Sequence, residues 1–409
     1  MESENIARKV KAVFNPPSLI LKQFFSLAYQ GWLTDWKGLP RWILKGNKVI
    51  ATAAGATSIG CTGYPYHVVW EITNRCNLDC IHCYASSVPS PQSELTTLEG
   101  KQLLEKMTEI PALRMIVITG GEPLIRNDIF ELVEYAGKLG FKIVFSTNGT
   151  LLTHKVAGDL VKMGVVNFSI SLDGSTAEKH ETIRPHSGCF NQTLEGIKAA
   201  AASGVCLQIN FTAMKQNLAE LPQVIDLAEE LGADICMVFQ TIPPCKDRGA
   251  VELNAEDQNQ LLRIIREKQR QKRMLLMPVC SPEYWPLIAN QHKNRLVPKS
   301  LKQAAFSGCG AGRGFCYIRF DGNVWPCNFI PLSAGNVRES SFADIWRNSA
   351  LLQQFYSLHK NLKDACGQCA DKQICGGCRG RAYAHFGDFW AADPNCNLVL
   401  KNKLPVTIQ

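Results

Sequence analysis

Short apolar runs alternate with amphipathic stretches between residues 66 and 242 of the chain. Six of these runs are rich in β-branched residues, and runs such as Ile-Val-Ile at 116–118 are apolar on both faces. A continuous apolar run of this length indicates a strand buried on both faces of a parallel sheet. The strands are predicted at residues 67–72, 115–119, 142–146, 167–172, 207–212 and 235–240.

The stretches between these runs have the period of helices and carry helix-start signals. Thr96 and Glu99, for example, form a capping box ahead of the first helical stretch. Six strand–helix repeats predict an α/β fold whose parallel sheet curves into a partial (β/α)6 barrel of the TIM type. Because such barrels carry their active sites at the carboxyl ends of the strands, residues that follow the strands are the candidates for chemistry.

The chain divides into four predicted segments. The third contains Pro278, Pro282 and Pro286 and is expected to be an irregular linker. The fourth has weak periodicity and many Cys and Gly residues, which indicates a small domain held by metal. The segments are an N-terminal amphipathic helical extension, the barrel, the linker and the Cys-rich domain, at residues 1–62, 63–275, 276–305 and 306–409.

Charge changes this picture only at the N-terminus. The 409 residues include 44 Lys and Arg against 36 Asp and Glu, and the net charge of +8 is too mild to indicate nucleic acid. Residues 17–45 combine an apolar helix with tryptophans and basic residues, which suits a membrane interface and equally a helix packed on the barrel. Residues 1–30 lack the pattern of a signal peptide, so we expect a cytoplasmic protein.

Seventeen cysteines are the unusual feature of the composition. Six are scattered, mostly in apolar contexts that are typical of small core residues: Cys61, Cys189, Cys206, Cys236, Cys245 and Cys280. The other eleven are the candidate metal ligands and lie in groups: Cys76, Cys80 and Cys83; Cys309, Cys316 and Cys327; and Cys366, Cys369, Cys375 and Cys378 followed by Cys396.

Cys76, Cys80 and Cys83 directly follow the first predicted strand. Soft thiolates select zinc, copper or iron–sulfur clusters. Since a cubane cluster has four irons, three cysteines leave one iron on which a substrate or cofactor can chelate. A structural zinc is the alternative, but it needs four ligands and only His82 is nearby in the sequence.

The spacing CxxxCxxC after a strand resembles the signature of the radical S-adenosylmethionine (SAM) superfamily. Residues 120–122, Gly-Gly-Glu, follow the second strand and are similar to that family's GGE motif, which binds the methionine amine of SAM. The resemblance implies a four-iron cluster that cleaves SAM to a 5′-deoxyadenosyl radical, and polar strand ends that contact SAM. The SAM-binding residues carried over are Gly120, Gly121, Glu122, Asn148, Ser171 and Asp173, the last two near the ribose.

Single residues at these strand ends also have a structural interpretation as caps and strand terminators. Arg184 could reach a carboxylate, and a surface salt bridge is its simpler interpretation. No general acid or base is assigned, because the difficult chemistry belongs to the cluster and SAM.

The C-terminal cysteines resemble the SPASM extension of radical SAM enzymes. One departure is that Gly376 and Gly377 alone separate Cys375 from Cys378, where the family usually has three residues. The resemblance implies two fully ligated auxiliary four-iron clusters, and hence electron transfer and an oxidative net reaction; two zinc ribbons are the alternative. The first cluster would use Cys309, Cys316, Cys327 and Cys378, and the second Cys366, Cys369, Cys375 and Cys396.

The tail of the chain looks most like the tetrapyrrole-modifying branch of this group, which includes heme b synthase, didecarboxysiroheme deacetylase and the maturase for d-type heme. The resemblance implies a porphyrin-like substrate that loses propionate carboxylates or acetate arms, and a one-electron donor of the flavodoxin or ferredoxin type. Four arginines could pair with substrate carboxylates or instead support the clusters: Arg313, Arg319, Arg379 and Arg381.

There are three alternatives to a tetrapyrrole-modifying enzyme. Peptide maturation is the main rival, although sulfatase maturases carry an acidic base after the third auxiliary cysteine, where this chain has Asn328. A lipid or prenyl substrate follows if residues 17–45 meet a membrane. A non-enzymatic electron carrier or zinc scaffold is disfavoured because it leaves residues 120–123 and the open iron without a use.

Overall fold

The strands form one ten-stranded sheet in a computed structural model of the chain. Its order is β10-β9-β8-β1-β2-β3-β4-β5-β6-β7, and every neighbouring pair from β8 to β7 is parallel. Only β9 and β10, which continue the sheet beyond β8, pair antiparallel. Besides Leu113 and a few residues between 28 and 38, the structure describes residues 67–85, 93–110, 115–243, 252–291 and 308–396.

The strands are β1 His67–Glu71, β2 Met115–Thr119, β3 Lys142–Thr147, β4 Val165–Ser171, β5 Cys206–Ala213, β6 Ile235–Gln240, β7 Leu275–Pro278, β8 Phe315–Ile318, β9 Asn323–Trp325 and β10 Gly335–Asn336. The α-helices of the barrel are α5 Thr97–Met107, α6 Ile129–Lys138, α7 His154–Lys162, α8 Ala177–Ile183, α9 Cys189–Ala202, α10 Leu221–Glu230, α11 Ala255–Gln271 and α12 Tyr284–Gln291. The C-terminal helices are α14 Phe342–Asn348, α15 Ala350–Tyr356, α16 Leu358–Asn361, α17 Asp364–Gln368 and α18 Arg379–Phe386.

The six predicted strands are confirmed as β1 to β6. Their bounds differ from the predicted ones by at most two residues, and β2 and β6 match at both ends. The apolar runs form strands because both faces are covered: Ile116 and Ile118 of β2 are fully buried in the main core.

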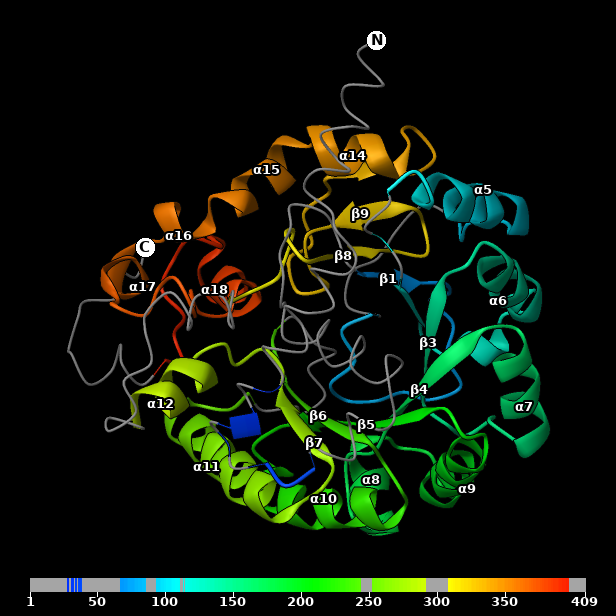
Figure 1. The fold of residues 1–409 in the computed structure, drawn as a ribbon, viewed down its shortest axis with the longest axis horizontal. Helices are drawn as coiled ribbons and strands as arrows, with labels where there is room; N and C mark the ends of the chain where they lie inside the picture. Colours follow the sequence, from blue (N-terminus) through cyan, green and yellow to red (C-terminus); the bar gives the residue numbers. More distant parts are fainter. Residues whose placement is uncertain are drawn as a thin grey trace.

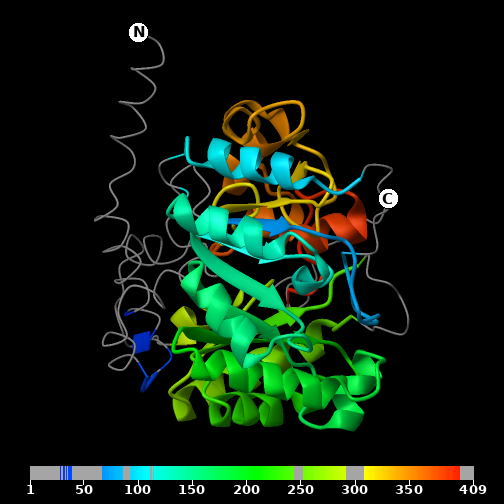
Figure 2. The same cartoon turned by 90° about the vertical axis from the view of Figure 1, so that its right-hand side faces the viewer.

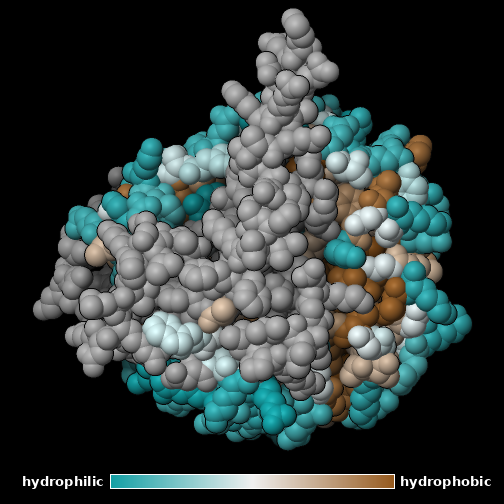
Figure 3. Space-filling model, in the orientation of Figure 1, coloured by the Kyte–Doolittle hydropathy of each residue, from teal (hydrophilic) through white to brown (hydrophobic). Residues whose placement is uncertain are grey.

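Helices surround the strands. In Figure 1, α5, α6, α7, α9, α8, α10 and α11 follow one another around the outside of the sheet. The predicted capping box is confirmed, since Thr96 and Glu99 bond each other's backbone at the start of α5. Polar side chains form the rim over these helices, and apolar ones lie further in, over β3 and β4 (Figure 3).

The barrel extends past the predicted boundary at residue 275. β7 pairs parallel with β6, and α12 follows it, within a segment that the prolines predicted to be an irregular linker. The prolines are tolerated because Pro278 ends an edge strand and Pro286 lies in the first turn of α12, where a missing N–H costs little.

The Cys-rich segment continues the same sheet. β8 pairs parallel with β1, so the sheet runs across the boundary predicted at residue 306. Figure 2 shows α14 and α15 on the β1 side of the molecule, opposite α10 and α11. The smaller C-terminal helices pack through two small apolar clusters that also contain cysteines.

Most of residues 17–45 lies outside the described residues, as do Cys61 and Cys245. Trp36 is buried and its indole Nε1 donates a hydrogen bond to the Arg273 carbonyl, 3.0 Å away. Within the part of the chain that the structure describes, none of the helices has the length and apolar character needed to cross a bilayer.

Candidate functional site

A cavity of about 410 Å³ runs through the barrel interior to the carboxyl ends of its strands. Met115 and Val117 of β2 line it from within the barrel, and Gly121 and Asn148 line it just beyond the strand ends. The Cys-rich segment supplies another part of the lining, including Cys327. The cavity therefore has one wall from each half of the chain.

Cys76, Cys80 and Cys83 all lie on the barrel side of this cavity. Burial is the main cause that raises the pKa of Cys80 to about 11. The Cys83 thiol adds to this rise, and the Arg184 guanidinium opposes it. The three thiols are thus close enough to influence one another. Bound iron would supply the positive charge that turns such thiols into thiolates.

Chain N–H groups are directed at these sulfurs. The backbone N–H of Leu78 donates to Cys76 Sγ at 3.4 Å, and Arg184 Nη1 donates to Cys80 Sγ at 3.5 Å. The Asn148 side-chain amide lies 4.0 Å from Cys76 Sγ. Donors to sulfur stabilise thiolate and tune the potential of iron–sulfur clusters, so this donor set fits the expected cluster.

The two glycines of residues 120–122 bring this loop against the cysteine loop. A Cβ on Gly121 would lie 2.1 Å from the Arg75 carbonyl oxygen and 2.9 Å from Cys76 Cβ. The Gly121 and Glu122 N–H groups donate to Thr73 and Arg75 carbonyls at 2.8 Å. Only glycine allows this approach, because any side chain would push the cysteine loop away.

Glu122 lies behind the cavity wall and is fully buried. Its carboxylate accepts hydrogen bonds from the Thr147 hydroxyl and the Asn148 N–H at 2.8 Å, and from the Leu124 N–H at 3.1 Å. A carboxylate has about four acceptor positions, so one is left for an ammonium group. The bonds from Thr147 and Asn148 tie the loop after β2 to the end of β3.

Of the other predicted SAM-binding residues, Asn148 and Ser171 line the cavity and Asp173 does not. Asp173 is fully buried and accepts hydrogen bonds from Arg184 Nε at 2.8 Å and from the Thr212 N–H at 2.7 Å. Burial works to raise the pKa of Asp173. The Arg184 charge, the His82 ring and the Thr212 N–H together outweigh burial and hold this pKa below the usual value.

The interpretation of Arg184 as a surface salt bridge is wrong. Its side chain is buried between Asp173 and Cys80, and its pair with Asp173 measures 2.7 Å. Because α8 ends at Ile183, Arg184 turns back under the cysteine loop, which sequence spacing alone could not show. His82 also faces Asp173, at 3.6 Å, so it is part of this network.

The structure brings three of the four cysteines predicted for the first auxiliary cluster together. Cys309, Cys327 and Cys378 line the same cavity as the first cysteine group. Burial, and after it the neighbouring Cys309 and Cys378 thiols, raises the pKa of Cys327 well above its usual value. Cys316 is instead fully buried in the main barrel core.

The four cysteines predicted for the second auxiliary cluster lie near one another. Burial raises the pKa of Cys375 well above its usual value, with the Glu283 carboxylate and the Cys396 and Cys366 thiols adding to it. Backbone N–H groups donate to three of the sulfurs at 3.3–3.4 Å. The short Cys375–Cys378 loop is possible because Gly376 and Gly377 have φ of +72° and +65°.

None of the four arginines that could meet substrate carboxylates lines the cavity, which favours the alternative that they support the cluster sites. Arg379 and Arg381 are fully buried and bond the chain around the cysteines. Arg319 pairs with Asp321 at 3.2 Å. Their partners are internal, so they support the fold around the cluster sites.

Cys280 is the residue of this site that the sequence did not indicate. It was predicted to be a core residue, as Cys189, Cys206 and Cys236 are, but it lines the cavity. It lies alone between Pro278 and Pro282, outside any cysteine motif. Among the described residues, no three His, Cys, Asp or Glu side chains lie close enough to hold a single metal ion. The zinc-ribbon alternative therefore gains no support. A cubane cluster has no such requirement, because it holds its thiolates farther apart.

Comparisons with known proteins agree with this geometry. Residues 70–228 match the Radical SAM superfamily, and residues 309–370 match SPASM, an iron-sulfur cluster-binding domain. The chain is 37% identical over 343 residues to the AdoMet-dependent heme synthase of Methanosarcina barkeri, covering 83% of this chain and 98% of that relative. It is 30% identical to the mycofactocin maturase MftC of Mycobacterium tuberculosis, covering 81% and 83%.

A solved structure shares the fold. SuiB of Streptococcus suis bound to S-adenosylmethionine superposes with a TM-score of 0.65 at 17% identity, covering 85% of this chain and 81% of that one. At this identity the likeness concerns the fold alone. It places the parallel sheet and the Cys-rich C-terminal segment in one known architecture.

Proposed function

This chain belongs to the radical SAM superfamily as an enzyme with a SPASM iron–sulfur domain, and we propose that it oxidises a carboxylate-bearing side chain of a tetrapyrrole. The observation that carries the proposal is the match to a heme synthase along 98% of that relative's length. The cavity supports it, because Val69, Val117, Phe239 and Trp285 offer apolar surface to a flat ring.

We propose that Cys76, Cys80 and Cys83 hold the SAM-binding cluster, with Gly121 and Asn148 beside SAM. Bound, this cluster and SAM supply a 5′-deoxyadenosyl radical, and the auxiliary clusters supply an electron acceptor. The chain's own part is to fix the cysteine loop, through the Gly121 contact, and to enclose the reacting carbon away from water.

The electron balance explains why acceptors are needed. Loss of a hydrogen atom and then carbon dioxide from a propionate arm leaves a carbon–carbon double bond only if one further electron departs. The C-terminal cysteines suit that need, since Cys309, Cys327 and Cys378 line the same cavity as the first cysteine group. We further propose a flavodoxin- or ferredoxin-type donor and a reducing compartment, which keeps these thiols available.

The test uses the full chain, reconstituted without oxygen, with SAM, dithionite and a panel of heme and siroheme derivatives. We expect a shifted visible spectrum on binding, and a product that has lost carbon dioxide with one 5′-deoxyadenosine formed per carboxylate. If 5′-deoxyadenosine forms but no member of the panel shifts or changes mass, the tetrapyrrole proposal is wrong.

Peptide maturation is the second candidate, supported by the likeness to the mycofactocin maturase. The chain offers Asn328 rather than a carboxylate at the cavity wall next to Cys327. A neutral amide cannot accept a proton as a general base does. A peptide substrate would therefore need a base from elsewhere in the cavity.

A further inference from the structure

We propose that Cys280, and not Cys316, is the fourth thiolate ligand of the first auxiliary cluster, together with Cys309, Cys327 and Cys378. The inference rests on the proposed function only in that the chain holds an auxiliary cluster at this wall of the cavity. It changes the ligand set that cysteine spacing predicted.

Strand geometry turns Cys316 away from the other three thiols. Side chains alternate between the two faces of a strand, and Phe315 of β8 lines the cavity. Cys316 therefore faces the helices, as does Val68, its parallel partner on β1. Both are fully buried in the main core, and burial is what raises the pKa of the Cys316 thiol.

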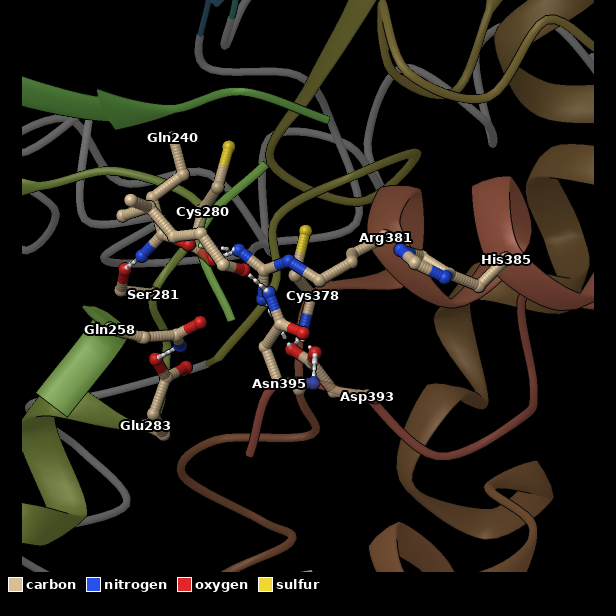
Figure 4. A network of polar contacts seen from close by, with 12 residues as sticks. Gln240, Gln258, Cys280, Ser281, Glu283, Cys378, Arg381, His385, Asp393 and Asn395 are labelled. Carbon is tan, nitrogen blue, oxygen red and sulfur yellow. Dashed lines mark hydrogen bonds and ion pairs between the residues drawn. The ribbon is translucent and has the colours of Figure 1, made fainter. Parts of the chain in front are cut away.

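Cys280 lies where the missing ligand is needed. It follows β7 by two residues and lines the cavity with Cys309, Cys327 and Cys378. Figure 4 shows the Cys280 and Cys378 sulfurs on the same side of the Arg381 guanidinium. The Cys280 and Cys378 thiols are also within hydrogen-bonding reach of each other.

The backbone at Cys280 is held in an uncommon conformation. Its φ of +63° lies in the left-handed region, which non-glycine residues rarely adopt unless their surroundings enforce it. Its carbonyl accepts a hydrogen bond from Arg381 Nη2 at 3.1 Å, and the next side chain, Ser281, bonds Gln240. Such strain is typical of functional sites.

One buried ion pair fixes both cysteines. Arg381 Nη1 lies 3.0 Å from each carboxylate oxygen of Asp393, and both side chains are fully buried. The same carboxylate accepts the Cys378 N–H at 2.7 Å (Figure 4). Arg381 thus ties the Cys280 carbonyl to the Cys378 amide, two segments about a hundred residues apart in the sequence.

With Cys280, the auxiliary cluster has four thiolate ligands. Four thiolates satisfy all four irons of a cubane, so none is left for a substrate. Three ligands would come from the Cys-rich segment and one from the barrel. The cluster would then join the two halves of the chain at the cavity wall, where it is placed to take an electron from a bound substrate.

The test compares three alanine variants of the full chain after reconstitution without oxygen: Cys280→Ala, Cys316→Ala and, as a matched control, Cys236→Ala on β6. Cys236 is fully buried in the barrel core. Iron and sulfide per chain and the EPR spectrum of the reduced protein are measured. The wild type should hold about twelve irons in three cubanes.

We expect Cys280→Ala to lose or alter one auxiliary EPR signal, with a loss of up to about four irons, while Cys316→Ala and Cys236→Ala keep the wild-type content and spectrum. If Cys280→Ala is too unstable to purify, Cys280→Ser preserves the volume and should shift the same signal through its oxygen ligand. An unchanged spectrum in the Cys280 variants, or a loss confined to Cys316→Ala, would overturn the inference.

The failure of this inference can be told from failure of the proposed function. 5′-Deoxyadenosine formation with SAM and dithionite in the wild type and in Cys236→Ala tests the first cluster, for which Cys76, Cys80 and Cys83 are the proposed ligands. A wild-type content of only about four irons would overturn the auxiliary clusters altogether. Twelve irons with no effect of Cys280 would overturn the ligand assignment alone.

Discussion

At the scale of single residues, the Arg184–Asp173 pair shows how the site is held. Both side chains are buried, and removing one partner of a buried pair leaves the other charge without compensation. We expect Arg184→Gln to lower the free energy of unfolding by about 3–5 kcal/mol. Lys155→Gln, which breaks the exposed pair with Asp159, should leave the free energy of unfolding almost unchanged.

Chemical unfolding midpoints, followed by circular dichroism without oxygen, measure both variants. Equal midpoints for Arg184→Gln and Lys155→Gln would show that the buried pair contributes no more than a surface one. A second effect is expected at the cluster, since Arg184 donates to Cys80 Sγ. The EPR signal of the first cluster should therefore change in Arg184→Gln and not in Lys155→Gln.

A buried carboxyl group makes stability depend on pH. Burial, opposed by the Arg319 charge, raises the pKa of Glu71 from 4.5 to about 8, with Tyr317 beside it and Asp321 and Tyr84 nearby. The folded chain therefore keeps a proton that the unfolded chain releases above pH 4.5. This stabilisation is complete below pH 4.5 and falls by about 1.4 kcal/mol per pH unit until pH 8.

Glu71→Gln should remove this dependence, because glutamine stays neutral at every pH. The difference in unfolding free energy between this variant and the wild type should change steadily from pH 5 to pH 8 in favour of the variant. The exposed Glu134→Gln serves as control. Parallel pH profiles for wild type and Glu71→Gln would contradict the buried neutral carboxyl.

Much of the site could be predicted from residue identity and spacing. The parts that were missed depend on strand pairing and on contacts between distant segments. The spacing of Cys76, Cys80 and Cys83 is local, so their common place in the cavity could be predicted. The strand that contains Cys316 was not predicted, and without it the face of that side chain could not be known. Cys280 joins the site only through contacts about a hundred residues away, which no local pattern records.

At the scale of elements, the loop of residues 120–122 positions the cysteine loop by direct contact. Gly121→Ala would place a methyl group 2.1 Å from the Arg75 carbonyl oxygen, so the cysteine loop must move. We expect loss of about four irons and of 5′-deoxyadenosine formation. Iron analysis and chromatography of the SAM reaction measure the two effects.

Gly158→Ala is the matched control for this change. Gly158 lies inside α7, and a Cβ there meets nothing within 4 Å. Alanine favours the helix by about 0.5–1 kcal/mol over glycine, so the variant should be at least as stable as the wild type and fully active. Equal iron content and activity in the two glycine variants would show that the loop contact is not needed.

The elements themselves were predicted unequally. β1 to β6 followed from apolar runs, because burial on both faces leaves a clear signal in sequence. β7 was missed since four residues ending in Pro278 carry little periodicity, and β8 was missed because its neighbour β1 lies more than two hundred residues away. Short strands form through their sheet partners rather than through their own pattern.

At the scale of the whole molecule, one sheet joins the barrel and the Cys-rich segment. β8 pairs with β1, and the cavity between the two halves is lined by cysteines from both. Arg381 adds a buried link between the halves. The cysteines proposed to form the radical and those proposed to accept an electron therefore line one cavity within a continuous sheet.

The central claim is that the three-cysteine loop holds a cluster with one iron open to SAM. Its most direct test is the EPR spectrum of the dithionite-reduced chain, prepared without oxygen, before and after SAM is added. We predict that SAM shifts the signal of one cluster in the wild type and in Cys236→Ala, and that Cys80→Ala shows neither this shift nor 5′-deoxyadenosine. An identical spectrum with and without SAM in the iron-replete wild type would contradict the account.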